Sequence, residues 1–181
     1  ACMGLLACSA SSVTIEGKDG INRQKEYYLY GCQAGSLIPI ASALIDSNGC
    51  FRLNVPLPQE GFYLLGTEQG VMHPFYLKGN ETIRLRFQTN GMILEGEQTP
   101  ENQALSQWEQ AATLVREHAF LYERFGGGYS TDPATFTQEL EDLLRVRQQL
   151  KPEKATGNAT FNSLLKAKME ADVDFEFELV I

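Results

Sequence analysis

The stretch LIPIASALIDSNGCFRLNV, from Leu37 to Val55, decides the fold. Two runs rich in aliphatic residues flank a turn sequence that contains Asn48-Gly49, and Asn-Gly is the pair that most readily adopts the positive φ angles of a type I′ turn. The pattern predicts a β-hairpin with a two-residue turn, which sets Leu44 opposite Leu53.

In that register one face of the hairpin is apolar. It collects Ile38, Ile40, Leu44, Phe51, Leu53 and Val55. An isolated hairpin of this kind is marginal in water, so the neighbouring segments should supply further strands and a second layer.

Short strands separated by turns continue on both sides of this stretch. Residues 82–87 alternate cleanly, with Ile83, Leu85 and Phe87 on one side and arginines on the other. Turn signals recur every 8 to 12 residues or so, which favours an antiparallel sandwich or barrel rather than βαβ units. We expect an antiparallel β-sandwich domain over residues 12–97, preceded by a linker over residues 1–11.

The hydrophobic rhythm changes at Thr99. Thr99-Pro100-Glu101 is a helix start, with a hydroxyl cap, a proline at the first position and an acid near the positive end of the helix dipole. An apolar stripe follows at steps of three or four residues: Leu105, Trp108, Ala111, Ala112, Val115, Ala119 and Tyr122. We expect Trp108 to anchor this helix against the sheet.

Two more helices follow the glycines at 126–128. Asp132-Pro133 opens the second helix, and a third begins near Asn158 and runs to about Asp174. The last residues alternate strictly, which suits a strand as well as a continuing helix. Residues 98–181 are therefore expected to be a helical connector of about three helices, and the fold class is α+β.

Charge and length exclude some classes of function. The chain has 181 residues with 15 basic and 23 acidic side chains, a net charge of −8. This balance repels nucleic acid, which we therefore exclude as a partner. No apolar run approaches the roughly 20 residues that a membrane-spanning helix needs.

The first residues resemble the end of a secretion signal. Leu5-Leu6-Ala7-Cys8 looks like a bacterial lipobox, in which the signal is cut before the cysteine and the cysteine is lipidated. The alternative is an apolar terminus without meaning. The lipobox predicts a lipid on Cys8, a membrane as partner and a location in the cell envelope, either facing the periplasm or in the outer membrane.

No motif for catalysis or metal binding stands out. There is no Cys-x-x-Cys and no Gly-x-Ser-x-Gly. Cys32 and Cys50 could pair with each other across neighbouring strands, but we expect them to be unpaired. His73 and His118 lack a ligand spacing and are interpreted as ordinary histidines. We expect no catalytic residue, no metal site and no cofactor; an enzymatic alternative would need one of these histidines beside a carboxylate in a cleft.

Aromatic residues on two strands could form a surface for a ligand or partner. They are Tyr27, Tyr28, Tyr30, Phe75 and Tyr76. Packing of the same residues in the core or at its rim is the interpretation that we prefer.

Several segments together resemble one known pattern. They are Thr14-Ile15-Glu16-Gly17, Tyr27 to Tyr30, Gly35 to Ala43, Gly49-Cys50-Phe51, Gly61-Phe62-Tyr63, Phe75 to Gly79 and Thr99-Pro100-Glu101-Asn102. The chain is similar, from about Ser12 to Leu105, to the all-β domain of unknown function that precedes a thioredoxin-like module in secreted lipoproteins of Gram-negative anaerobes. It departs from that pattern at Ala41, where members often carry aspartate.

The resemblance implies a function for the whole protein. In that family a helical connector leads to a TlpA- or ResA-like thiol-disulfide oxidoreductase domain, whose Cys-x-x-Cys has no counterpart here. We therefore expect a non-catalytic accessory domain for docking, dimerisation or substrate positioning, with either a thioredoxin-like domain or a second copy as partner. The alternative is a stand-alone envelope module that binds a sugar or a peptide.

Overall fold

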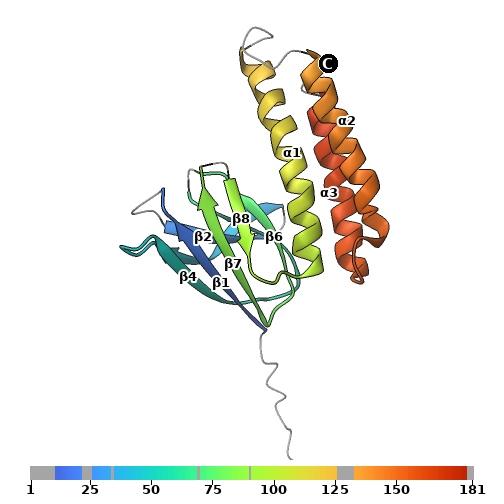
Figure 1. Ribbon diagram of the computed structural model, residues 1–181. Coiled ribbons are helices and arrows are strands. Elements are labelled where there is room, and N and C mark those ends of the chain that lie inside the picture. The colour runs from blue at the N-terminus through green and yellow to red at the C-terminus, as the bar shows by residue number, and fades with distance from the viewer. Residues whose placement is uncertain are drawn as a thin grey trace, which may run out of the picture. The chain divides into compact units, whose positions relative to one another are not determined.

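The computed structural model describes residues 11–21, 26–33, 35–68, 70–89, 91–125 and 133–178. The chain divides into two compact units, Ala1–Gln98 and Thr99–Ile181. The first contains every strand and the second contains every helix of the described residues (Figure 1). The predicted α+β class is confirmed.

The first unit is built from two four-stranded sheets. One has the order β4-β1-β7-β8 and the other has the order β3-β2-β5-β6. The strands are β1 (Ser12–Asp19), β2 (Glu26–Gln33), β3 (Ser36–Leu44), β4 (Cys50–Pro56), β5 (Gly61–Gly66), β6 (His73–Leu77), β7 (Glu81–Gln88) and β8 (Gly91–Glu95).

The pairings are antiparallel with one exception. β1 pairs parallel to β7, with Ile15 opposite Ile83, and antiparallel to β4, with Ile15 opposite Leu53. The first strand of the chain therefore lies in the middle of its sheet. The sandwich is mostly antiparallel rather than wholly so.

The predicted hairpin between Leu37 and Val55 is wrong. β3 pairs with β2 and β4 pairs with β1, so the two runs belong to different sheets. The segment between them is a corner. Gly49 has φ 79°, whereas Asn48 does not have the positive φ that a type I′ turn requires.

Asp46 organises this corner. Its carboxylate Oδ1 accepts hydrogen bonds from the backbone N–H groups of Asn48 and Cys50, each at 2.8 Å. Its backbone carbonyl accepts from Gly49 at 3.0 Å, and its backbone N–H donates to Cys50 at 2.8 Å. These contacts describe a type I turn followed by a left-handed glycine, which is the alternative use of an Asx-x-Asn-Gly sequence.

The core lies between the two sheets. One sheet contributes residues such as Val13, Ile15 and Leu85, and the other contributes residues such as Leu29 and Leu65, all almost completely buried. The alternation predicted for residues 82–87 is confirmed for Ile83 and Leu85, which are buried, while Phe87 packs against the core and is partly buried.

The second unit contains three helices and a short 3-10 turn. They are α1 (Pro100–Phe125), α2 (Pro133–Leu150), η2 (Pro152–Lys154) and α3 (Ala159–Glu178). The predicted cap of α1 is confirmed, because the Thr99 hydroxyl accepts a hydrogen bond from the backbone N–H of Asn102 at 3.3 Å. α3 runs four residues past the predicted end at Asp174, so the alternating tail is helical to Glu178.

Polar contacts join the helices to one another. The buried indole of Trp108 on α1 donates a hydrogen bond to Asp172 on α3 at 2.7 Å. Lys168 bridges the same two helices, with its ammonium 2.8 Å from Glu109 and 2.9 Å from Asp172. The indole of Trp108 therefore joins α1 to α3 within the helical unit.

Candidate functional site

The outward face of the β3-β2-β5-β6 sheet carries a pair of tyrosines. Tyr27 and Leu29 are buried in the core, so alternation along β2 turns Tyr28 and Tyr30 outward, where both are half-buried. Their ring centroids lie 5.9 Å apart with the planes inclined by 36°. Such a pair offers aromatic surface and two hydroxyl groups on one side of the sheet.

Glu26 fixes the hydroxyl group of Tyr28. The hydroxyl donates a hydrogen bond to the Glu26 carboxylate at 2.7 Å. Two hydrogen bonds lower the pKa of Glu26, and the one from Ser42 has a larger effect than the one from Tyr28. The bond to Glu26, followed by desolvation, raises the pKa of Tyr28 to about 12. This end of the face therefore holds one carboxylate beside a neutral phenol at neutral pH.

The structure divides the five aromatic residues that we predicted for a ligand surface. Tyr27 and Phe75 are core residues and do not belong to any surface. Tyr76 is buried as well, and its ring meets Phe62 edge-on with centroids 5.6 Å apart. Tyr28 and Tyr30 are the two that remain partly exposed and lie together.

Tyr27 forms the centre of an aromatic stack inside the sandwich. Its ring lies 4.3 Å from the ring of Phe51 and 4.7 Å from that of Phe87. Its hydroxyl donates a hydrogen bond to the buried carboxylate of Asp19 at 2.8 Å. Burial, together with this bond, raises the pKa of Tyr27 well above that of a free tyrosine.

Large apolar side chains are exposed on β3. They are Leu37 (51% exposed), Ile38 (39%), Ile40 (37%) and Leu44 (72%). Three of them, Ile38, Ile40 and Leu44, were predicted to face the core, and that prediction is wrong. The inward positions are instead taken by Ala41 and Ala43, which pack against the core opposite Leu29 and Tyr27.

The distribution of charge along the sequence is a signal for this surface that hydrophobic alternation alone does not reveal. No charged residue occurs between Glu26 and Asp46, although charged residues make up 21% of the chain. A strand with one buried face normally carries charges on the other. β3 therefore lacks the charged side chains that β4 and β7 of the other sheet carry.

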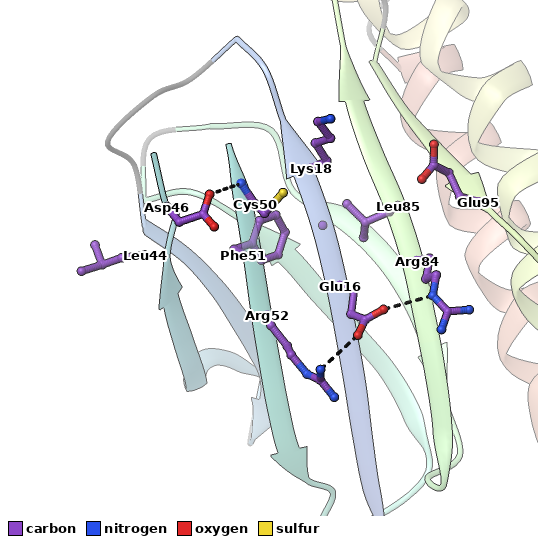
Figure 2. A pocket seen from close by; sticks show the side chains of 11 residues that line it. Glu16, Lys18, Leu44, Asp46, Cys50, Phe51, Arg52, Arg84, Leu85 and Glu95 are labelled. Atoms are coloured by element: carbon purple, nitrogen blue, oxygen red, sulfur yellow. Dashed lines mark hydrogen bonds and ion pairs between the residues drawn. The ribbon is translucent and has the colours of Figure 1, made fainter. Parts of the chain in front are cut away.

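The other sheet presents a charged outward face with a groove in it. The groove has a volume of about 540 Å³ and is lined by residues of β1, β4, β7 and β8, by Leu44 at the end of β3 and by Asp46 in the corner that follows. Figure 2 shows Glu16 in its centre, pointing between Arg52 and Arg84. The Glu16 carboxylate lies 3.3 Å from Arg52 and 3.0 Å from Arg84.

The charges of this groove compensate one another. The lining carries three basic side chains (Lys18, Arg52 and Arg84) and three acidic ones (Glu16, Asp46 and Glu95). Glu95 also pairs with Arg86, and Asp46 is engaged by the backbone of its own turn. Exposed pairs of this kind contribute little to stability, and their arrangement is that of a hydrated charged surface.

His118 has a carboxylate neighbour that the sequence did not reveal. Nδ1 of His118 on α1 lies 2.6 Å from Oε2 of Glu139 on α2, and both side chains are mostly buried. His73 lies in the sandwich with its ring 5.3 Å from that of Phe87. Within the described residues, no group of three or more histidine, cysteine, aspartate or glutamate side chains could hold a metal ion.

The structure tests the prediction for Cys32 and Cys50 but not the one for the lipid site. Cys32 and Cys50 are free, as predicted. Cys8 lies outside the residues that the structure describes. Among the helices that the structure does describe, none combines the length and the apolar character needed to cross a membrane.

Comparisons with known proteins give distant structural matches. No protein-family model matches the chain, and no curated protein does. A DUF3823 family protein from Parabacteroides merdae aligns with 42% of this chain at 18% identity and a TM-score of 0.32. The Bacillus anthracis TIE protein aligns with 42% of this chain at 16% identity and a TM-score of 0.28. The aligned part spans 46% and 16% of those chains. The description of the fold is therefore based on the strands of this chain and their pairing, not on these matches.

Proposed function

We propose that this chain is the non-catalytic docking region of a cell-envelope lipoprotein, held at a membrane by a lipid on Cys8. The sequence resemblance extends the proposal to the parent protein. It puts this region ahead of a TlpA- or ResA-like thiol-disulfide oxidoreductase domain, and the connection to that domain rests on the resemblance alone.

One observation carries the docking role, namely the difference between the two outward faces of the sandwich. The β4-β1-β7-β8 face is covered by paired charges such as Glu16 with Arg52 and Arg84. The β3-β2 part of the other face presents Tyr28 and Tyr30, and Leu44 is exposed at the end of β3, where it also borders the groove of the charged face. The first face is typical of a surface exposed to water, whereas the second is suited to contact with a partner.

The energetics favour covering the apolar face. Each Å² of apolar surface removed from water stabilises a complex by about 25 cal/mol before the cost of association. Leu44 leaves 72% of its surface in water, and Tyr28 and Tyr30 add partly exposed rings. Aromatic rings held by the strand on which they lie lose little freedom on binding, which is why tyrosines are frequent at interfaces.

A thiol-disulfide exchange assay tests the non-catalytic part of the proposal. The 181-residue chain is incubated with insulin and dithiothreitol, and the reduction of insulin is followed. We expect the background rate, because the two described cysteines lie on different strands as single thiols. Turnover that disappears in the Cys32→Ser or Cys50→Ser variant would overturn the proposal.

Labelling tests the anchor. Cells that express the gene are grown with a radiolabelled fatty acid, and the protein is recovered from the membrane fraction. The natural protein should carry label, and the Cys8→Ala variant should not. Equal labelling of both proteins would remove Cys8 from the proposal.

A binding module for sugar or peptide is the second candidate. The tilted pair of Tyr28 and Tyr30 favours it, since two aromatic faces beside the hydroxyl of Tyr28, which Glu26 holds in place, suit sugar rings and extended peptides. A glycan array with the natural protein and the Tyr28→Ala and Tyr30→Ala variants tests it. Binding that both variants lose supports this candidate, and no binding by the natural protein removes it.

A further inference from the structure

The β3-β2-β5-β6 sheet carries one acidic side chain and no basic one. Its four strands, all of them described, contain neither lysine nor arginine, and Glu26 is their single acidic residue. The strands of the other sheet carry charges of both signs, which pair with one another as Glu16 does with Arg52 and Arg84. Glu26 therefore has no basic residue on the strands of its own sheet.

Two carboxylates act on Tyr28. Its hydroxyl donates a hydrogen bond to Glu26 at 2.7 Å, and Glu68 follows two residues after Gly66, which lies opposite Tyr28 on β5. The hydrogen bond to Glu26 is the largest cause of the raised pKa of Tyr28, followed by desolvation and then by the charges of Glu26 and Glu68. Within the described residues, neither carboxylate forms an ion pair. The negative charge around this ring is thus open to a partner.

The tyrosine rings favour the same sign of ligand charge. The rings of Tyr28 and Tyr30 lie 5.9 Å apart, and both residues are half-buried. The face of an aromatic ring is negative and attracts a cation that lies within about 6 Å of the ring centroid. The hydrogen bond that Tyr28 donates to a carboxylate increases the electron density of its ring, which strengthens this attraction.

Apolar groups border the tyrosine pair. Pro39 and Leu64 lie opposite Tyr30 on the two neighbouring strands, and residues that lie opposite each other share a face of the sheet. A Cβ atom on Gly66 would lie 2.8 Å from the backbone oxygen of Val71, whose side chain is 75% exposed. A ligand on this face therefore meets apolar surface next to the negative charge.

These features select an arginine side chain among the possible ligands. An anion is repelled by the carboxylates, and a neutral sugar makes no use of them. A guanidinium group is planar, so it can lie on a tyrosine ring while its N–H groups donate to a carboxylate. The net charge of −8 also attracts basic partners over a distance.

We propose that the outward face around Tyr28 and Tyr30 binds an arginine side chain of a partner protein. The guanidinium lies over the tyrosine rings, and its N–H groups point to the carboxylates of Glu26 and Glu68. The apolar surface at Leu64 and Val71 receives the residues next to that arginine. The inference rests on the proposed docking role of this face and names the chemistry of its partner.

Peptide titration of the isotope-labelled 181-residue chain, followed by nuclear magnetic resonance, tests the proposal. The probe is Gly-Leu-Arg-Leu-Gly with blocked ends, and the matched peptide has citrulline, which keeps the shape of arginine without its charge. We expect the arginine peptide to bind at least about tenfold more tightly than the citrulline peptide, and added salt to weaken its binding. Equal affinities, or no binding of the arginine peptide, would overturn the proposal.

Variants locate the binding on the tyrosine face. Glu26→Gln should weaken binding of the arginine peptide at least about threefold, whereas Glu16→Gln removes the same charge from the opposite face and should have little effect. Tyr30→Leu should weaken binding, and Tyr30→Phe should keep it, because the ring face rather than the hydroxyl contacts the cation. Far-UV circular dichroism checks that each variant folds. Equal effects of the two glutamate variants, or of the two Tyr30 variants, would contradict the assigned site.

The outcome is separate from that of the proposed function. Insulin reduction by the chain would contradict the non-catalytic role and leave arginine binding standing. A chain that is silent in the insulin assay and binds both peptides equally, or neither, would contradict the arginine site alone.

Discussion

The hydroxyl of Tyr27 donates a hydrogen bond to the carboxylate of Asp19 in the interior of the sandwich, at 2.8 Å. Asp19 is completely buried, and its other carboxylate oxygen accepts from the backbone N–H of Ile21, also at 2.8 Å. The Tyr27 ring meanwhile lies between Phe51 and Phe87. One side chain thus joins the aromatic core to a buried charged group.

Removing the Tyr27 hydroxyl tests how much this hydrogen bond contributes to the free energy of unfolding. Tyr27→Phe keeps the ring stack but leaves the Asp19 carboxylate with one partner fewer, which should lower the free energy of unfolding by about 1–3 kcal/mol. Urea denaturation followed by circular dichroism measures it. Tyr30→Phe, on the half-exposed face, is the control and should change stability by less than about 0.5 kcal/mol. A similar loss in both variants would contradict the special role of the buried bond.

Alkaline pH should destabilise the sandwich. The pKa of Tyr27 is higher in the folded than in the unfolded chain, so above about pH 10 the unfolded state binds fewer protons than the folded state. Stability that is fully present below that pH therefore falls as the pH rises further. Tyr28 and Tyr63, whose pKa values are also raised, act in the same direction. Denaturation midpoints between about pH 8 and about pH 11 should show this fall, and Tyr27→Phe should make it shallower. An equal slope in both proteins would contradict the assignment to Tyr27.

Gly17 should not tolerate a side chain. It lies opposite Phe51 in the β1–β4 pair, and a Cβ atom at this position would overlap the Phe51 ring. Gly17→Ala should therefore cost about 1–3 kcal/mol, because the stack of Phe51 and Tyr27 must shift. Gly20→Ala, where a Cβ meets nothing within 4 Å, is the matched control. The prediction fails if thermal unfolding of the two variants coincides.

The bond between Trp108 and Asp172 should stabilise the helical unit. Asp172→Ala removes the acceptor of a fully buried indole and one partner of Lys168, with an expected cost of about 2 kcal/mol. Trp108 is the only tryptophan of the chain, so its fluorescence reports unfolding of this unit specifically. Asp142→Ala, which removes an exposed pair with Arg145, should cost less than about 0.5 kcal/mol. Equal midpoints for the two variants would contradict the prediction.

Sequence patterns predicted those parts of the fold that depend on a single local rule, namely the alternation of β7 and the cap of α1. Ile83 and Leu85 alternate with arginines and are buried. Thr99 and Pro100 open a helix because cap geometry depends only on nearby residues. The prediction of a Leu37–Val55 hairpin failed because its aliphatic residues suit either face of a strand. Ala41 and Ala43, not Ile40 and Leu44, fit the space beside Leu29 and Tyr27.

Contacts between distant residues lay beyond sequence reasoning. His118 and Glu139 are 21 residues apart, and Trp108 and Asp172 are 64 apart. Each pair forms only because helices are placed side by side, and local pattern carries no information on that placement. The same limit applied to the candidate site, since which aromatics of β2 and β6 face outward depends on which sheet covers them.

The position of β1 has a consequence for the order in which the molecule can assemble. Glu16 meets Arg84 across a separation of 68 residues, while β1 also forms the ladder with β4. β1 is synthesised before its parallel neighbour β7, and the strands β2 to β6 are made between them. A nascent chain interrupted before Glu81 would leave one side of β1 without its neighbour, so we expect this sheet to be completed only after β7 has been synthesised.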